Sequence, residues 1–502
     1  MSIKLNLFAN YLSQFYIGVI GVVLIPVYIG LIGIEAYGLV GFFATIQSLF
    51  VVLDLGLSST AIKEVTKFRG GKSDLREFRL TLRSIEIIFW GISLSSMLVL
   101  VLSAKYLTTD WLEFNELAFE EVYYSVILIA FSAGTRWCVA FYKGVHTGYE
   151  EIVFLSKFNA IFATFRFVLV IPFLQYVSSS PVAFFIFQGM VACIELIYII
   201  YKSYTLIPKE ESIGWSVSSV CGIGKVLKFS VSVSVISLLW VFISQYDKTV
   251  LSGWMGLSDY GVYMMLVLAA SIITYFTSGL YNVLLPRLSV LHAEDELSEM
   301  KSVYKKYTQF ILIMIVPISA TVFFFSDRVL KLWAGVEYDT DVFNTLSFLA
   351  LGNMFVPLLA FPYMVQYAYS DFKIAIFGNF IVASIIPFGV YVMFLHLGVY
   401  GVSINWSVIM FLHFMITSML VHNKFFGVFH LKWMLKDVMP ISITVYVLAY
   451  ILSIVIIDVD DKALMFVSLF ACYLLLVFLS ILVSSEFREI VVDKIKLKLK
   501  PI

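Results

Sequence analysis

Two arginines fall inside long apolar runs of this sequence, where a charged side chain is costly unless protein or water surrounds it. Arg136 and Arg166 lie on the fourth and fifth runs, roughly 9–12 Å from the ends of these runs on one side. The planar guanidinium group matches phosphate oxygens well. Two such groups at matching depth predict a site for phosphate or pyrophosphate. The alternative is that both side chains reach back to the lipid headgroups.

The first two apolar runs carry four further polar residues at helical spacing. Asn10 and Gln14 are four residues apart on the first run, and Gln47 and Asp54 are seven apart on the second. This spacing places each pair on one helix face, which predicts the hydrated wall of a cavity. The alternative is hydrogen bonding that only fixes helix packing. For Asp54 we expect a gating or ion-coupling role, as partner of a cavity arginine or as a proton carrier.

Asp247 and Lys248 close the seventh run. Adjacent residues on a helix do not face one another, so we do not expect a simple ion pair. We assign Lys248 to the cavity and Asp247 to gating or ion coupling. The six histidines show no spacing typical of metal ligands, so neither a metal site nor another cofactor is expected.

Motifs of common enzymes are absent or incomplete. Residues 71–73 (GKS) match the end of a phosphate-binding loop, but Thr66 stands where the first glycine is required. Asp339 and Asp341 have the spacing of a metal-binding Asp-x-Asp motif, but acidic pairs are frequent in solvated turns. The sequence therefore predicts that the protein is not an enzyme.

The elements that must position these residues are membrane-spanning helices. The chain has 502 residues, of which 61% are hydrophobic and only 14% are charged, and its mean hydropathy is +0.95. The apolar residues form continuous runs of about 20, the length a helix needs to cross a bilayer. We predict fourteen spans, near residues 7–29, 38–57, 84–103, 122–142, 158–177, 182–201, 229–251, 259–285, 307–326, 342–368, 374–395, 401–421, 437–457 and 463–483.

The distribution of lysine and arginine predicts the orientation. The N-terminal side and the even-numbered connections carry 27 of the 34 basic residues, and the opposite side carries four. Because cytoplasmic loops are enriched in lysine and arginine, both termini are expected in the cytoplasm.

A repeated segment suggests two lobes built on one plan. Residues 32–40 (IGIEAYGLV) return as residues 255–263 (MGLSDYGVY), six spans later. An even displacement gives both lobes the same orientation, as in parallel repeats. A shorter relative at residues 397–402 (LGVYGV) indicates that part of this signal is turn chemistry. We predict an N-lobe of spans 1–6, an inter-lobe linker, a C-lobe of spans 7–12, and spans 13–14 with a basic cytoplasmic tail, at residues 1–205, 206–228, 229–422 and 423–502.

Several short motifs, in order along the chain, resemble one family. They are residues 10–14 (NYLSQ), 25–29 (IPVYI), 33–38 (GIEAYG), 53–57 (LDLGL), 247–248 (DK), 261–263 (GVY) and 285–289 (LPRLS). This chain is similar to the Wzx-type O-antigen and polysaccharide flippases of the multidrug/oligosaccharidyl-lipid/polysaccharide (MOP) exporter superfamily. The resemblance implies two six-helix lobes around a central cavity, in the bacterial inner membrane.

The resemblance also implies a function and partners. A flippase of this type moves an undecaprenyl-pyrophosphate-linked oligosaccharide, such as an O-antigen repeat unit of lipopolysaccharide, from the cytoplasmic to the periplasmic leaflet by alternating access. Partners would be that lipid-linked substrate, the bilayer and other assembly proteins, namely a polymerase and a chain-length regulator, and no nucleic acid. The alternatives are a cation-coupled multidrug exporter of the same superfamily and a membrane polysaccharide polymerase or glycosyltransferase. The sugar composition and the use of a proton or other ion gradient stay open.

Overall fold

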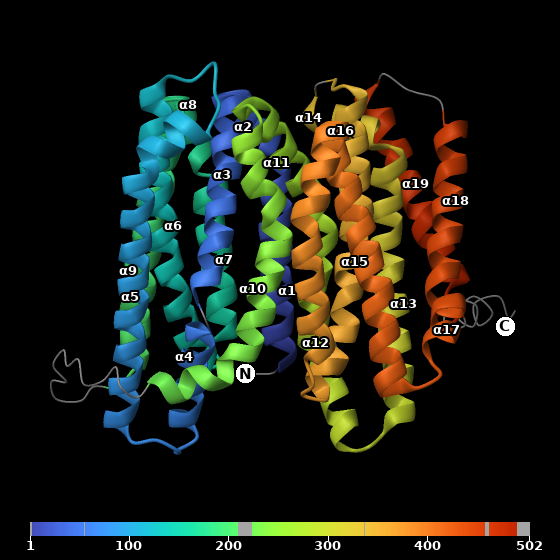
Figure 1. Cartoon of the computed structure of the whole chain (residues 1–502), viewed down its shortest axis with the longest axis horizontal. Helices are drawn as coiled ribbons and strands as arrows, with labels where there is room; N and C mark the ends of the chain where they lie inside the picture. Colours follow the sequence, from blue (N-terminus) through green and yellow to red (C-terminus); the bar gives the residue numbers. More distant parts are fainter. Residues whose placement is uncertain (1–2, 55, 209–222, 336, 457–460, 489–502) are drawn as a thin grey trace, which may run out of the picture. The chain divides into compact units, whose positions relative to one another are not determined.

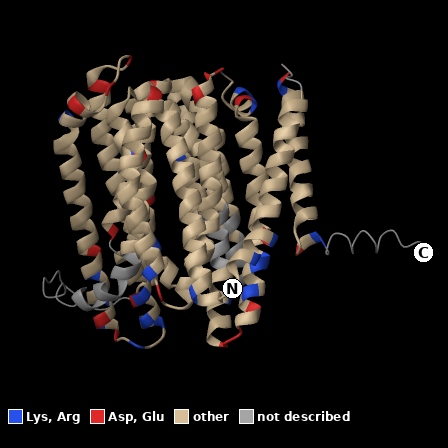
Figure 2. Ribbon diagram, turned by 45° about the vertical axis from the view of Figure 1, so that its right-hand side comes forward, with Lys and Arg blue, Asp and Glu red and all other residues tan. Residues whose placement is uncertain are grey.

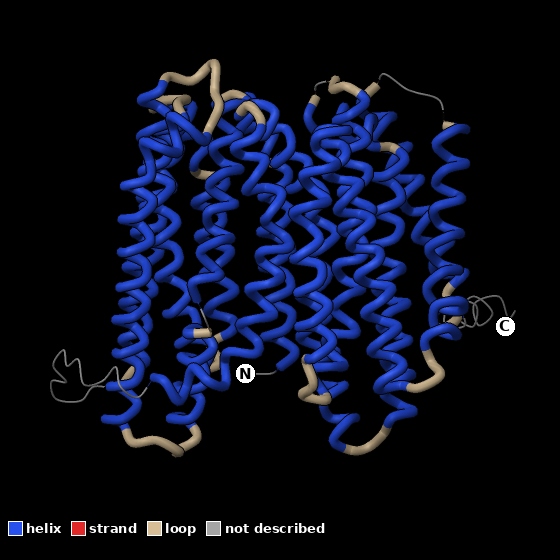
Figure 3. The backbone as a smooth tube through the Cα atoms, viewed as in Figure 1, coloured by secondary structure: helices blue, strands red, loops and turns tan. Residues whose placement is uncertain are grey.

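The computed structural model describes residues 3–54, 56–208, 223–335, 337–456 and 461–488. Most of these residues are helical, and none belongs to a strand beyond the isolated bridge between Glu113 and Gly256 (Figure 3). The prediction of an all-α membrane protein is confirmed. The basic tail at residues 494–500 and most of the predicted linker lie outside the described residues.

The chain forms two compact units, each described here by itself. Unit 1 comprises Met1–Met265 and unit 2 comprises Leu266–Ile502. The helices of unit 1 are α1 (Ile3–Val23), α2 (Ile25–Ile32), α3 (Ile34–Phe50), η1 (Val51–Asp54), α4 (Leu57–Arg69), α5 (Leu75–Tyr106), η2 (Leu107–Trp111), α6 (Phe119–Gly148), α7 (Ile152–Phe167), α8 (Val170–Tyr176), α9 (Pro181–Leu206), α10 (Ile223–Trp254) and most of α11 (Leu257–Ser271), as labelled in Figure 1.

Unit 2 begins inside α11, at Leu266, and contains the remaining helices. These are η4 (Ile272–Tyr275), α12 (Phe276–Ala293), α13 (Leu297–Phe324), α14 (Ser326–Ala334), α15 (Thr340–Ala368), α16 (Lys373–Val421), η5 (His422–Phe426), α17 (His430–Trp433), η6 (Met434–Val438), α18 (Met439–Val455) and α19 (Lys462–Val483). The division falls inside α11 because α10 packs against α3 and α4 within unit 1. The predicted lobe boundaries at residues 205, 228 and 422 stay predictions.

In the described part of the chain, twelve helical segments are long and apolar enough to cross a membrane. One of them, Lys373–Phe426, covers two predicted spans and bends at Gly398, whose φ of +61° is a conformation that other residues rarely adopt. Helix α10 coincides with the predicted span 229–251 but is not among the twelve. The chain is therefore a multi-pass membrane protein, and the count of fourteen spans stays a prediction.

Basic residues gather at one end of the helices within unit 1. This basic end contains the turn between α4 and α5, where Gly71 has a φ of +70°. Figure 2 shows the blue Lys and Arg ribbon segments concentrated toward the lower helix ends. The opposite end of unit 1 contains the turn at Gly33 and the connection at residues 107–118. This sidedness supports the predicted orientation without establishing it.

Candidate functional site

All eight residues predicted for the site lie in unit 1, on neighbouring elements. Helix α1 packs against α7, α7 against α6, α6 against α3, and α3 against α10. These helices and η1 carry the predicted residues Asn10, Gln14, Gln47, Asp54, Arg136, Arg166, Asp247 and Lys248. Contacts between helices thus link all the elements that carry the predicted polar residues.

Arg166 is buried inside unit 1, in the last turn of α7. Its side chain is 7% exposed, and its Nε donates to the carbonyl of Phe162 at 3.2 Å. Gln188 Nε2 donates to the Arg166 carbonyl at 3.0 Å. Arg166 lies fourteen residues, about 21 Å, from the start of α7 at the basic end. The structure therefore favours the buried interpretation of this residue over contact with headgroups.

Arg136 lies at a similar distance from the same end. It is partly buried on α6, about 18 Å before the end of that helix at Gly148. Its guanidinium makes no hydrogen bond or ion pair with another described residue. Both helices extend beyond the predicted spans, since α6 continues past residue 142 and α7 begins before residue 158, and the predicted depth of 9–12 Å below the membrane surface stays a prediction.

The polar side chains of α1 and α3 add hydrogen-bonding capacity beside the arginines. Asn10 and Gln14 are partly exposed on α1, which is fixed to α7 by the bond from Ser13 Oγ to the Ser156 carbonyl at 2.9 Å. Gln47 Nε2 on α3 is buried without a partner among the described residues. A buried amide without a partner is costly, so it marks a position where a ligand or water could bind.

Asp54 has a local role at the end of α3. Its Oδ1 accepts from the Ser58 backbone N–H at 3.0 Å and from Ser58 Oγ at 2.8 Å. These bonds satisfy a free N–H group at the start of α4, directly after Gly56 with its φ of +79°. Neither Arg136 nor Arg166 bonds to this carboxylate, and its gating role stays a prediction.

Asp247 and Lys248 form an ion pair, so the expectation that they would not pair is wrong. Lys248 Nζ lies 3.0 Å from Asp247 Oδ1 and donates to the Ser244 carbonyl at 2.7 Å. The long lysine stem folds back over its own helical turn, which brings adjacent residues together despite their different directions. Asp247 is 6% exposed and also accepts a short hydrogen bond from Tyr263 on α11.

The two copies of the repeated segment contact each other, which the sequence did not predict. A Cβ on Gly38 would lie 2.2 Å from the Leu257 carbonyl oxygen, and a Cβ on Gly261 would lie 2.5 Å from the Ile34 carbonyl oxygen. Ile34 and Leu257 are the first residues of α3 and α11, and the glycines are the fifth. The contact is therefore reciprocal, and only glycine allows the two helices to cross so closely. We call it the glycine crossing.

Hydrogen bonds connect the glycine crossing to the ion pair. Tyr260 is fully buried, and its hydroxyl lies 3.1 Å from Thr45 Oγ1 on α3. One turn further along α11, Tyr263 binds Asp247 on α10. The sequence signal that could have found these residues is the repeated Tyr-Gly pair itself.

Glu35 fixes the connection between α5 and α6 near the glycine crossing. Its carboxylate accepts the backbone N–H groups of Asn115, Glu116 and Leu117 at 2.6, 2.7 and 2.7 Å. The same connection accepts the Leu257 N–H at the Glu113 carbonyl, at 2.7 Å. The start of α11 is therefore bound to α3 by close packing and to this connection by hydrogen bonding.

Comparison with known proteins shows what this chain is similar to. Residues 151–343 match a protein family described as "Polysaccharide biosynthesis protein". No curated protein matches the chain by sequence. The fold is that of transporters of the MOP superfamily, and the predicted resemblance is confirmed.

Three solved structures illustrate the similarity of fold. The lipid II flippase MurJ, in an inward closed conformation, matches 97% of this chain and 100% of its own at 14% identity, with a TM-score of 0.71. An inward-facing MATE family multidrug transporter matches 84% of this chain and 96% of its own at 14% identity, with a TM-score of 0.63. The MATE transporter VcmN of Vibrio cholerae matches the same shares at 14% identity, with a TM-score of 0.58. These three proteins are one flippase and two transporters.

Proposed function

We propose that this protein is a flippase that moves an undecaprenyl-pyrophosphate-linked oligosaccharide across the bacterial inner membrane by alternating access. The observation that carries the proposal is the pair of arginines on α6 and α7, about 18 and 21 Å from the ends of these helices at the basic end. A pyrophosphate needs such donors when it leaves water, and Arg136 has guanidinium N–H groups not bonded to any described residue.

The polar residues of unit 1 suit the movement of a charged headgroup across the membrane. A sugar–pyrophosphate headgroup cannot cross hydrocarbon unaided, because its polar groups would lose their hydration. Its polyprenyl tail is apolar and can stay in lipid. Asn10, Gln14 and Gln47 would bind the headgroup by hydrogen bonds while Arg136 and Arg166 hold the phosphates. Both termini would then be cytoplasmic, and polysaccharide assembly proteins would act on the translocated product.

The glycine crossing supplies an element that could open and close. It lies at the end of unit 1 opposite the basic end, which is the periplasmic end if the basic end is cytoplasmic. Opening would separate α3 from α11 and break the bond between Thr45 and Tyr260. Asp247, beside Tyr263, would couple this movement to an ion or to the headgroup.

A cation-coupled multidrug exporter is the second candidate. It is favoured by the similarity of the fold to MATE transporters, although these match a smaller share of the chain than MurJ does. An exporter would need no phosphate-binding arginines, so the two functions differ in what Arg136 and Arg166 must contact.

Deletion of the gene distinguishes the two functions. A flippase deletion should trap lipid-linked repeat units on the cytoplasmic leaflet and reduce surface polysaccharide, with unchanged accumulation of cationic dyes. Unchanged surface polysaccharide together with increased dye accumulation would overturn the flippase proposal. Reconstitution with defined lipid-linked oligosaccharides would then identify the sugar and any ion gradient used.

A further inference from the structure

A groove lies on unit 1 between α5, α6 and α9, away from the predicted translocation residues. Its volume is about 840 Å³. On α6, Val145 lines the groove and lies nine residues from Arg136, which is about 180° around the helix. The groove therefore opens on the side of α6 opposite Arg136. Figure 1 shows α5 and α9 together at one edge of unit 1.

One stripe of α5 forms most of the groove and changes character along its length. Arg79 and Arg83 stand near the basic end, four and eight residues after the start of the helix. Trp90, Gly91 and Leu94 follow on the same side, up to about 22 Å from Arg79. The stripe therefore runs from cationic through aromatic to apolar, in the order that a lipid presents its headgroup, glycerol region and acyl chain.

The polar floor of the groove is hydrogen-bonded. Glu86 is 6% exposed, and its carboxylate accepts from Tyr142 at 2.6 Å, from Tyr204 at 2.8 and 2.9 Å, and from Arg83 Nη1 at 2.5 Å. Trp90 Nε1 donates to the Tyr142 hydroxyl at 3.2 Å. This network fixes the side chains that surround the groove, so the groove is a formed site rather than a gap between mobile side chains.

The charge of the lining selects an anion. Arg79 and Arg83 contribute two positive charges and Glu86 contributes one negative charge, which leaves a net charge of +1 among the lining residues. A single phosphate diester neutralises this charge. Further along the stripe, a Cβ on Gly91 would meet nothing within 4 Å, and Leu94 is 57% exposed. The apolar part of the groove is therefore open to a chain lying against it.

We propose that this groove binds an anionic glycerophospholipid, with its phosphate against Arg79 and Arg83 and an acyl chain along Trp90, Gly91 and Leu94. A zwitterionic lipid would bring an additional positive charge to the arginines, so it binds more weakly. The site does not depend on the proposed transport function, because it lies on the opposite side of α6 from Arg136.

The test is native mass spectrometry of the purified full-length protein, titrated with phosphatidylglycerol or with phosphatidylcholine of identical acyl chains. The wild type should prefer phosphatidylglycerol. Arg79→Gln should weaken phosphatidylglycerol binding about fivefold, because one basic residue near a lipid surface contributes on the order of that factor. Gly91→Leu fills the apolar part without changing charge and should weaken both lipids equally.

Arg76→Gln is the matched control, since Arg76 is exposed on α5 but does not line the groove. It should bind phosphatidylglycerol like the wild type. Equal binding of both lipids by the wild type, or equal effects of Arg79→Gln and Arg76→Gln, would overturn the proposal. Undecaprenyl phosphate at equimolar concentration should not displace phosphatidylglycerol; displacement would assign the groove to the substrate lipid instead.

Discussion

Two groups of buried polar side chains, one in each unit, differ in how they are partnered. In unit 2, Gln309 Nε2 donates to Asp437 Oδ1 at 2.6 Å, and His413 lies 3.1 Å from Asn379 Oδ1. In unit 1, neither the Arg136 guanidinium nor the buried Gln47 Nε2 bonds to another described residue. Partnered groups fix helices, whereas unpartnered groups remain available to a ligand.

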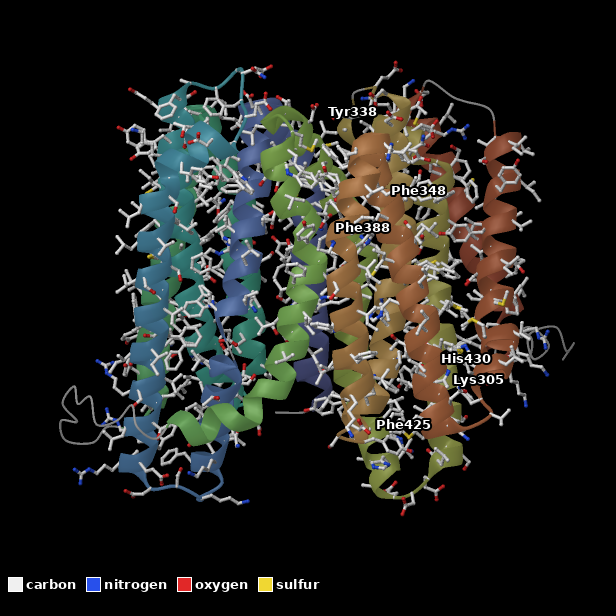
Figure 4. All side chains as sticks on the ribbon, in the orientation of Figure 1. Lys305, Tyr338, Phe348, Phe388, Phe425 and His430 are labelled. Carbon is white, nitrogen blue, oxygen red and sulfur yellow. The ribbon has the colours of Figure 1, made fainter. Side chains whose placement is uncertain are left out.

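The polar side chains around Asp437 in unit 2 are all hydrogen-bonded or ion-paired to one another. Asp437 also lies 3.5 Å from Lys305 Nζ, which in turn lies 3.0 Å from Glu486 Oε1. Figure 4 labels Lys305 and His430 near one end of unit 2. Ser484, directly after α19, donates to Gln309 Oε1. These contacts tie α13, η6 and the end of α19 together, so we expect the cluster to stabilise the fold without taking part in transport.

The largest expected effect on transport comes from replacing Arg136 and Arg166. Arg136→Ala and Arg166→Ala should each reduce transport of lipid-linked oligosaccharide about 10–100-fold, as expected for a lost hydrogen bond to a charged group. The lysine variants should retain more activity, because they keep the charge and lose only the planar fork. Transport is measured in proteoliposomes, with thermal stability as the control. Undiminished transport in all four variants would contradict a phosphate-binding role for Arg136 and Arg166.

The next effect comes from the glycine crossing. Gly38→Leu places a side chain against the Leu257 carbonyl and should separate α3 from α11, at a cost of about 1–3 kcal/mol. Because this favours one conformation, transport should fall about tenfold while the protein remains folded. Gly30→Leu on α2 is the control, since a Cβ there meets nothing within 4 Å. The accessibility of cysteines introduced on α3 and α11 would report the separation of these two helices. Equal transport in Gly38→Leu and Gly30→Leu would contradict a gating role of the glycine crossing.

A smaller effect is expected at the ion pair of α10. Asp247→Asn should reduce transport several-fold, because it removes the carboxylate charge that lies 3.0 Å from the mostly buried Lys248 ammonium. The double variant Asp247→Asn with Lys248→Met removes the lysine charge as well. If the pair is only structural, the double variant should recover stability and transport together. If Asp247 couples an ion, stability alone should recover, and transport should stay low at every imposed gradient.

The apolar runs predicted the helical membrane fold well, whereas the orientation predicted from the basic residues stays a prediction. Helices coincide with all the predicted spans, because continuous hydrophobicity over about 20 residues leaves few other structures possible. The predicted span 122–142 ends before its helix does, because α6 continues through polar residues such as Lys143 and His146 to Gly148. Hydropathy marks the hydrocarbon core and does not mark where a helix ends.

The missed parts of the site depend on contacts between distant residues. Glu35 bonds to backbone groups about 80 residues away, and the two Tyr-Gly segments meet across more than 200 residues. A repeated motif shows that two segments are alike but not that they touch. Gly398 in the third copy bends α16 between two spans with a positive φ, as Gly33 in the first copy forms a turn with a positive φ. The glycine after the tyrosine packs closely in all three copies, but in the third copy Gly401 packs against the Met393 carbonyl of its own α16 rather than against another copy.

The smallest effect on transport should come from unit 2. Asp437→Asn keeps an acceptor for Gln309 but loses the charge attraction to Lys305, so we expect a loss of about 1–2 kcal/mol of stability and unchanged transport. Glu299→Gln is the matched control, since its ion pair with Arg287 is about half exposed and should contribute under about 1 kcal/mol. Thermal unfolding and proteoliposome transport, measured on the same preparations, separate the two properties. A transport defect in Asp437→Asn without a change in stability would show that partnered polar groups also serve transport, and the contrast between the units would then fail.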